Sequence, residues 1–146
     1  MIGEAALPLA EPEELLHRQV HPGWINDGRV SSQAFQPTKK DAGQLSVSRG
    51  SLVSSREAFV RHLAKGLASA GTWSVLVLEC GDAGTPVFAD PIQATDPRGL
   101  AQDDAHAFVD FRGLGGGAAQ KRVADKLATK ARERGATFLP PGKSTE

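Results

Sequence analysis

The sequence is poor in cysteine and in aromatic residues. Cys80 is the one cysteine in 146 residues, so no disulfide can form within the chain, and a reducing compartment is expected. Tyrosine is absent, and aromatic residues make up only 5% of the chain. Leu, Val and Ala must therefore supply most of the hydrophobic core, with the six Phe as its largest pieces.

The sequence also lacks an excess of either charge and any long apolar run. Its 17 basic and 17 acidic residues cancel, which makes nucleic acid an unexpected partner. No segment approaches the roughly 18 consecutive apolar residues of a transmembrane helix. Residues 1–8 have neither the basic nor the apolar region of a signal peptide. We therefore expect a cytoplasmic protein that makes no contact with a membrane.

Hydrophobic patterning predicts a single domain of strands and helices. The expected strands, each an alternating or continuous run of apolar residues, are 29–35, 44–48, 72–79 and 105–111. Helices are expected at 54–67, where a capping-box pattern precedes apolar residues at helical spacing, and at 118–134. One or two helical turns are also expected just before His17, because Pro and acidic residues suit a first turn.

These elements predict an α+β fold. We expect a mixed β-sheet with two amphipathic helices packed on it, forming one domain over residues 11–140. Residues 1–10 and 141–146 are expected to be flexible tails.

Polar and aromatic side chains are concentrated in residues 17–49. This segment holds two of the four histidines and one of the two tryptophans. Its candidate binding residues are His17, His21, Trp24, Arg29, Ser32, Phe35 and Arg49. Arg and large aromatic side chains carry most of the energy of protein interfaces, so the segment predicts a surface that binds another protein. The alternative for Trp24 is that it fills one end of the sheet.

Three further features favour a structural interpretation. The glycine run at 113–117 lacks the Gly-Lys-Ser/Thr ending of a phosphate-binding loop, so it is expected to be a connector. Cys80 follows a strongly apolar run and is expected to act as a small hydrophobic residue. His17 and His21 are four residues apart, but Pro22 prevents a shared helix face, so no metal site is expected.

One enzymatic alternative depends on the order of three residues. Arg18 (or His17) lies in an early extended segment, Ser46 on an alternating strand, and Glu79 at the end of the strand expected at 72–79. Over about residues 15–80 this order resembles the sequential triad of the ADP-ribosyltransferase family. The resemblance implies NAD as the cofactor, with Arg18 and Ser46 holding it and Glu79 acting at the ribose.

The sequence therefore supports two hypotheses of different classes. The first is a small non-enzymatic accessory module, without metal or cofactor, that binds another protein through residues 17–49. The second is an NAD-dependent transferase that uses Arg18, Ser46 and Glu79 as its catalytic residues.

Overall fold

A six-stranded antiparallel sheet forms the centre of the computed structural model, which describes residues 6–97 and 99–141. The strands lie in the order β1-β7-β8-β5-β2-β6, and all pairings in the described residues are antiparallel. Their bounds are β1 Leu7–Pro8, β2 Leu15–Gln19, β5 Gln44–Arg49, β6 Thr72–Leu76, β7 Val87–Ala89 and β8 His106–Asp110. A separate two-stranded hairpin consists of β3 (Ile25–Asn26) and β4 (Arg29–Val30).

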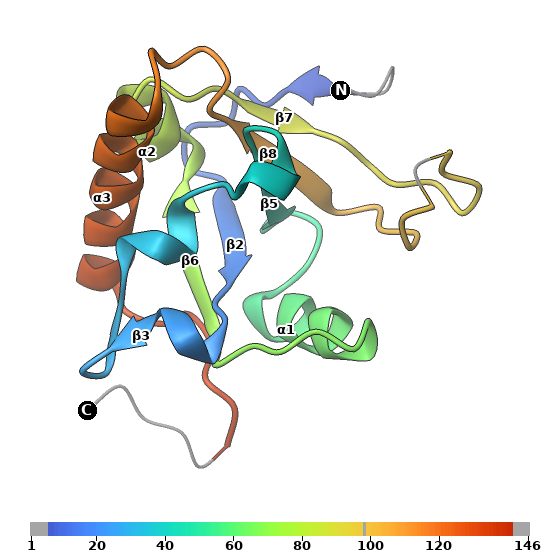
Figure 1. Ribbon diagram of the computed structural model, residues 1–146. Coiled ribbons are helices and arrows are strands. Elements are labelled where there is room, and N and C mark those ends of the chain that lie inside the picture. The colour runs from blue at the N-terminus through green and yellow to red at the C-terminus, as the bar shows by residue number, and fades with distance from the viewer. Residues whose placement is uncertain (1–5, 98, 142–146) are drawn as a thin grey trace.

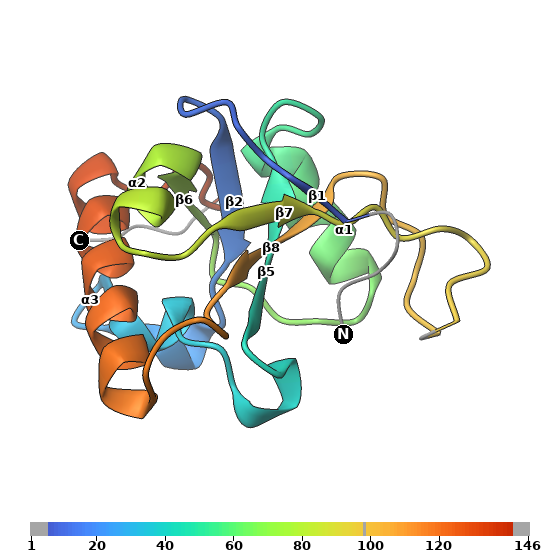
Figure 2. The same ribbon diagram turned by 90° about the horizontal axis from the view of Figure 1, so that it is seen from above.

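Two long helices lie on opposite faces of the sheet, as Figures 1 and 2 show. The helix α1 (Ser55–Ala64) covers β2 and β6 from one side, and α3 (Gly117–Arg134) covers β6 from the other. A short helix, α2 (Val77–Asp82), follows β6 directly and lies beside α3. A short 3-10 helix, η1 (Pro22–Trp24), connects β2 to the hairpin, and two more, η2 (Ser32–Phe35) and η3 (Lys39–Asp41), connect the hairpin to β5.

The main core lies between the sheet and α3. Alternate residues of each strand point to this side, as the period of two in a β-strand requires. Val123, Leu127 and Ala131, at helical spacing on α3, are each at most 4% exposed and pack in this core. The residues that share it include Leu16, Leu45, Val47, Val75, Ala107 and Val109 of the strands and Val20, which directly follows β2. The expected apolar stripe of helix 118–134 is therefore confirmed.

The predicted α+β fold is confirmed, with differences in detail. The sheet is antiparallel instead of mixed, and α2 is a third helix that the sequence did not predict. The apolar run 72–79 leaves the sheet after Leu76 because the carboxylate of Glu79 accepts the N–H of Leu76 at 2.8 Å, which caps the first turn of α2. None of the described helices combines the length and apolar character that crossing a membrane requires.

The ends of the predicted elements differ more. A strand, β2, occupies the positions before and around His17 where helical turns were expected. Residues 32–35 form η2, so the expected strand 29–35 is only two residues long. Leu7 and Pro8 pair with β7, so this part of the expected N-terminal tail belongs to the sheet. Residues 1–5 and 142–146 of the expected tails lie outside the described residues.

Candidate functional site

Arg18 connects three elements beneath the surface of residues 17–49. It extends from β2 on the side of the sheet that faces α3. Its Nε donates to the main-chain oxygen of Ala34 in η2 at 2.7 Å, and its Nη1 donates to that of Ser46 in β5 at 3.0 Å. Burial lowers the pKa of Arg18 to about 10, against the opposing charge of Asp41, so the guanidinium stays charged at neutral pH.

The structure does not bring Arg18, Ser46 and Glu79 together. Adjacent residues of a strand alternate in direction, so Ser46 points away from the core face that Leu45 and Val47 occupy. Arg18 therefore meets only the main chain of Ser46. Arg18 pairs with Trp73 near the start of β6, whereas Glu79 lies in α2, beyond the other end of that strand. Glu79 forms an ion pair with Arg134 at 2.9 Å. The three side chains do not surround one cleft, and no transferase is proposed.

Trp24 and His21 support each other at the start of the hairpin. Trp24 is half-buried and packs against the main core, and its ring centre lies 5.3 Å from the Arg18 guanidinium carbon. The exposed His21 accepts the N–H of Gly23 at 2.9 Å, which caps η1, and its ring lies 5.7 Å from that of Trp24. Part of the Trp24 ring is therefore used inside the fold.

Three other predicted binding residues are used inside the fold. Phe35 is fully buried, and so it cannot contact a partner. His17 is 5% exposed and shares a 2.8 Å hydrogen bond between its Nδ1 and the Oγ of Ser74. Arg49 donates to both carboxylate oxygens of buried Glu14, at 3.0 and 3.1 Å. These three side chains therefore pack or form hydrogen bonds inside the fold and do not build an outer binding surface.

Arg29 and Ser32, in contrast, line a common open hollow of about 450 Å³ beside the hairpin, which we call the hairpin pocket. Its lining residues are Asn26, Asp27, Arg29, Val30, Ser31, Ser32 and Arg132. The turn between β3 and β4 has positive φ at Asp27 (52°) and Gly28 (76°), the conformation of a type I′ hairpin. Asp-Gly is a dipeptide typical of this turn type.

The hairpin is fixed to the rest of the molecule from two directions. The N–H of Ser31 donates to the main-chain oxygen of Trp24 at 2.9 Å. From α3, Nη1 of Arg132 donates to the main-chain oxygen of Val30 at 2.8 Å, and Nη2 donates to the hydroxyl of Thr129 at 3.2 Å. The pocket wall is therefore held in place before any ligand binds.

The electrostatics of the hairpin pocket favour an anion. Arg29 is exposed, and its side chain has no partner among the described residues. Arg132 uses two of the five N–H donors that a guanidinium carries. One carboxylate, that of exposed Asp27, lines the pocket. Ser32 donates to Asp125 of α3, and this hydrogen bond, with smaller contributions from the charges of Lys121 and Arg132, holds the pKa of Asp125 below its ordinary value.

Ser31, one of the residues that line the pocket, has an unsatisfied hydroxyl. The Oγ of Ser31 is buried and has no hydrogen-bond partner among the described residues. Ser31 precedes η2, but its side chain does not cap that helix. Buried polar groups without a partner are rare in folded proteins, and each needs an explanation.

Sequence reasoning did not place Ser31 or Arg132 at a site. Arg132 belongs to a helix whose outer face carries many basic residues, so no local signal distinguishes it from a solvated arginine. Its role depends on the contact with Val30, which is 102 positions away in the chain.

The described residues hold no group of three or more His, Cys, Asp and Glu side chains that could bind a metal ion. Comparison with known proteins gives no match to a family model, to a curated protein or to a solved structure.

Proposed function

We propose that this protein is a binding module whose hairpin pocket receives an acidic side chain of a partner protein. The observation that carries the proposal is that two arginines line the same pocket: Arg29, whose side chain has no partner among the described residues, and Arg132. A carboxylate can accept hydrogen bonds from two guanidinium groups together. The pocket is open to solvent, so a side chain projecting from another protein can reach it.

The rigidity of the hairpin supports this function. Binding costs less free energy when the receiving groups are already held in position. Arg132 is anchored by Val30 and Thr129, while the turn at Asp27–Gly28 fixes the end of the hairpin. Arg29 is the one side chain of this group that must become ordered when the partner binds.

An acidic peptide tests the proposal directly. Isotope-labelled protein is titrated with hexaglutamate and, separately, with uncharged hexaglutamine, and backbone amide signals are followed by NMR. We expect the signals of Arg29, Ser31, Ser32 and Arg132 to shift with the acidic peptide only. Arg29→Glu should weaken this binding by about tenfold or more, because it replaces attraction by repulsion.

A matched variant separates a specific pocket from general charge attraction. Lys40→Glu makes the same change of charge at an exposed residue of η3, within the same segment of chain. It should weaken peptide binding less than about twofold. Equal losses in the two variants, or shifts that avoid the hairpin pocket, would show that the pocket is not the binding site.

A further inference from the structure

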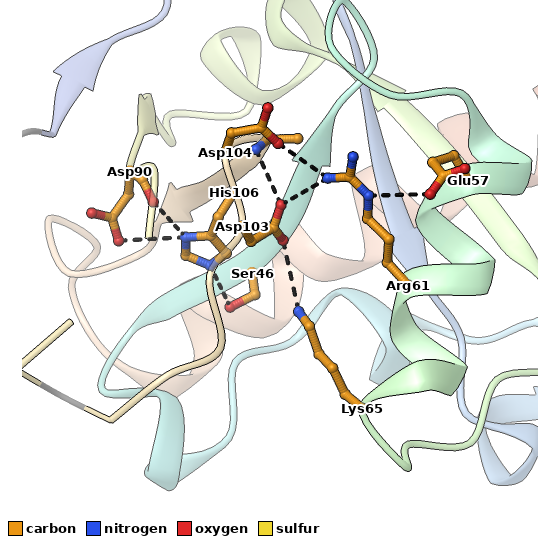
Figure 3. A network of polar contacts seen from close by, with 9 residues as sticks. Ser46, Glu57, Arg61, Lys65, Asp90, Asp103, Asp104 and His106 are labelled. Carbon is orange, nitrogen blue, oxygen red and sulfur yellow. Dashed lines mark hydrogen bonds and ion pairs between the residues drawn. The ribbon is translucent and has the colours of Figure 1, made fainter. Parts of the chain in front are cut away.

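Ser46, His106 and Asp90 meet on three neighbouring strands, on the face of the sheet opposite α3. Ser46 lies in β5, His106 begins β8, and Asp90 directly follows β7. The register pairs His106 with Ser48 and places Ser46 diagonally opposite. Figure 3 shows the three side chains in contact, with the imidazole ring of His106 between the other two.

The contacts of His106 fix which ring nitrogen carries the proton. Nδ1 lies 2.9 Å from the main-chain oxygen of Asp90. A carbonyl oxygen can only accept a hydrogen bond, so Nδ1 of the neutral ring must be the protonated nitrogen. Nε2 then presents its lone pair to the hydroxyl of Ser46, 3.3 Å away. This is the orientation in which a histidine can remove a proton from a serine.

The carboxylate of Asp90 completes the arrangement. Its Oδ2 lies 3.4 Å from Nδ1 of His106, and its side chain is only 4% exposed. An acidic side chain at this position helps to hold the ring with Nε2 toward Ser46. The main chain also links the two residues, because the N–H of Asp90 donates to the oxygen of His106 at 2.9 Å.

A network from α1 holds the start of β8 in place. Nη1 of Arg61 donates to Asp103 at 3.3 Å and to Asp104 at 3.1 Å, and Nζ of Lys65 lies 3.7 Å from the other oxygen of Asp103 (Figure 3). Asp103 in turn accepts the N–H of Ala105, the residue before His106. These contacts fix the position of the imidazole, whereas Ser46 remains exposed to solvent.

We propose that Ser46 is the nucleophile of an acyl-transfer centre that hydrolyses carboxylic esters, with His106 as its general base and Asp90 as the residue that orients His106. A nucleophile in contact with a base, and a base oriented by a third group, is the arrangement that activates a serine hydroxyl. The proposal adds a catalytic site to the binding function above and goes against the non-enzymatic expectation from the sequence.

The reaction needs no reagent other than ester and water. Oγ of Ser46 forms a bond to the ester carbonyl carbon while its proton moves to Nε2 of His106. The bond to the alcohol oxygen breaks, and that oxygen takes the proton from the imidazolium. Water, deprotonated by Nε2, then adds to the acyl carbon, and the acid leaves as Oγ of Ser46 regains a proton.

This centre shares Ser46 with the triad expected from sequence but differs from it in every other respect. Its base and orienting residue are His106 and Asp90, in place of Arg18 and Glu79. It also requires no NAD. The chemistry follows from the hydroxyl of Ser46, which faces away from Arg18.

A fluorophosphonate probe, which reacts with activated serines and releases fluoride, tests the proposal. Mass spectrometry of the labelled full-length chain should locate the adduct at Ser46, and the same protein should hydrolyse p-nitrophenyl acetate. His106→Gln should slow labelling by about 100-fold or more, because the base is lost. The amide of Gln can still donate to the main-chain oxygen of Asp90, which helps this variant to fold.

Two further variants make the result specific. Asp90→Asn should slow labelling by only about tenfold, because the main-chain oxygen of residue 90 still fixes the ring tautomer. Ser48→Ala, on the same face of β5 beside His106, should label at the rate of the unmodified protein. An adduct on another residue, or full labelling of a folded His106→Gln protein, would overturn the proposal. Arg29→Glu should label normally, so this test is independent of the hairpin pocket.

Discussion

Arg18 donates from Nη1 to the main-chain oxygen of Ser46 at 3.0 Å, while the hydroxyl of Ser46 points out of the opposite face of the sheet. The contact occurs where β2 and β5 are not paired directly, since their register includes only Leu16 with Arg49 and His17 with Ser48. The guanidinium therefore joins the two strands where the pairing between them stops. It also joins them to η2 through Ala34.

This position predicts a large effect of Arg18 on stability. Arg18→Ala removes two charge-assisted hydrogen bonds and the contact with Trp24, and it leaves two carbonyl oxygens without their donor. We expect the free energy of unfolding to fall by about 3 kcal/mol, measured by urea titration. Arg29→Ala, at an exposed arginine without a partner, should change it by less than about 0.5 kcal/mol. Similar values for the two variants would refute the structural role.

Trp24 is predicted to contribute to stability through the same cluster. Trp24→Ala removes a half-buried ring that packs against the main core and against Arg18. The expected loss is about 2 to 3 kcal/mol, visible as a lower melting temperature. Loss of partner binding by this variant would therefore not identify an interface. An unchanged melting temperature would instead mean that Trp24 belongs to the outer surface.

Glu14 is predicted to stabilise the end of β2 in a pH-dependent way. Burial raises the pKa of Glu14, but the hydrogen bonds from Arg49 and Ser51 together lower it by more, so it lies below the ordinary value. Because the pKa is lower in the folded state, the ionised carboxylate stabilises the fold at pH values above the unfolded pKa. This stabilisation is lost as the pH falls through the folded pKa. At neutral pH, Glu14→Gln should cost about 3 kcal/mol in urea unfolding.

The cost of Glu14→Gln should shrink in acid, where the carboxylate of the unmodified protein is protonated. Glu13→Gln is the matched control, because the neighbouring Glu13 is exposed. It should change stability by less than about 0.5 kcal/mol at either pH. A cost of Glu14→Gln that is the same in acid as at neutral pH would contradict an ionised, paired Glu14.

The sequence predicts the elements of this fold better than it predicts the sites. The strand at 44–48 and the helix at 118–134 follow from side-chain patterns that repeat within one element, and these patterns decide which face is buried. The run 72–79 was predicted as one strand because apolar residues occupy both β6 and the start of α2. The change at Leu76 depends on a single capping contact from Glu79.

Both proposed sites depend on contacts between distant parts of the chain. Arg132 reaches Val30 only because η2 and the hairpin pack on α3. Ser46 reaches His106 only because β5 and β8 pair in one register; a shift by one residue would turn Ser46 to the other face. No local pattern at Ser46, Asp90 or His106 contains this information. It arises from the order of strands in the sheet.

His17 is predicted to make the fold less stable in mild acid. Burial lowers the pKa of His17, against the opposing effect of a main-chain contact at Val53. The folded state then binds fewer protons than the unfolded state, so stability falls as pH decreases below the ordinary histidine pKa of about 6.5. The slope of unfolding free energy against pH should be smaller in His17→Gln. The contribution of each histidine to this slope cannot exceed about 1.4 kcal/mol per pH unit.

A second histidine separates this effect from general acid sensitivity. Burial also lowers the pKa of His62, and the charges of Lys65 and Arg18 lower it further, while a main-chain contact at Ala68 opposes them. His62→Gln should remove a further part of the slope, and the double variant should be the least sensitive to mild acid. An unchanged slope in both single variants would exclude the two histidines as its cause.

Cys80 is predicted to be inert in the folded protein. It is fully buried at the middle of α2, and burial, with a smaller contribution from the charge of Glu79, raises the pKa of its thiol to about 12. At about pH 8 roughly one molecule in 10,000 would carry the reactive thiolate, and the sulfur is shielded even then.

Ellman's reagent should therefore react with the native protein at least about 1,000-fold more slowly than with protein unfolded in guanidinium chloride. Cys80→Ala combined with Ala101→Cys, which moves the thiol to an exposed loop, should react at nearly the same rate in both states. Rapid reaction of native Cys80 would mean that α2 opens readily from the sheet, because a thiol in this position can react only when the helix that buries it moves away.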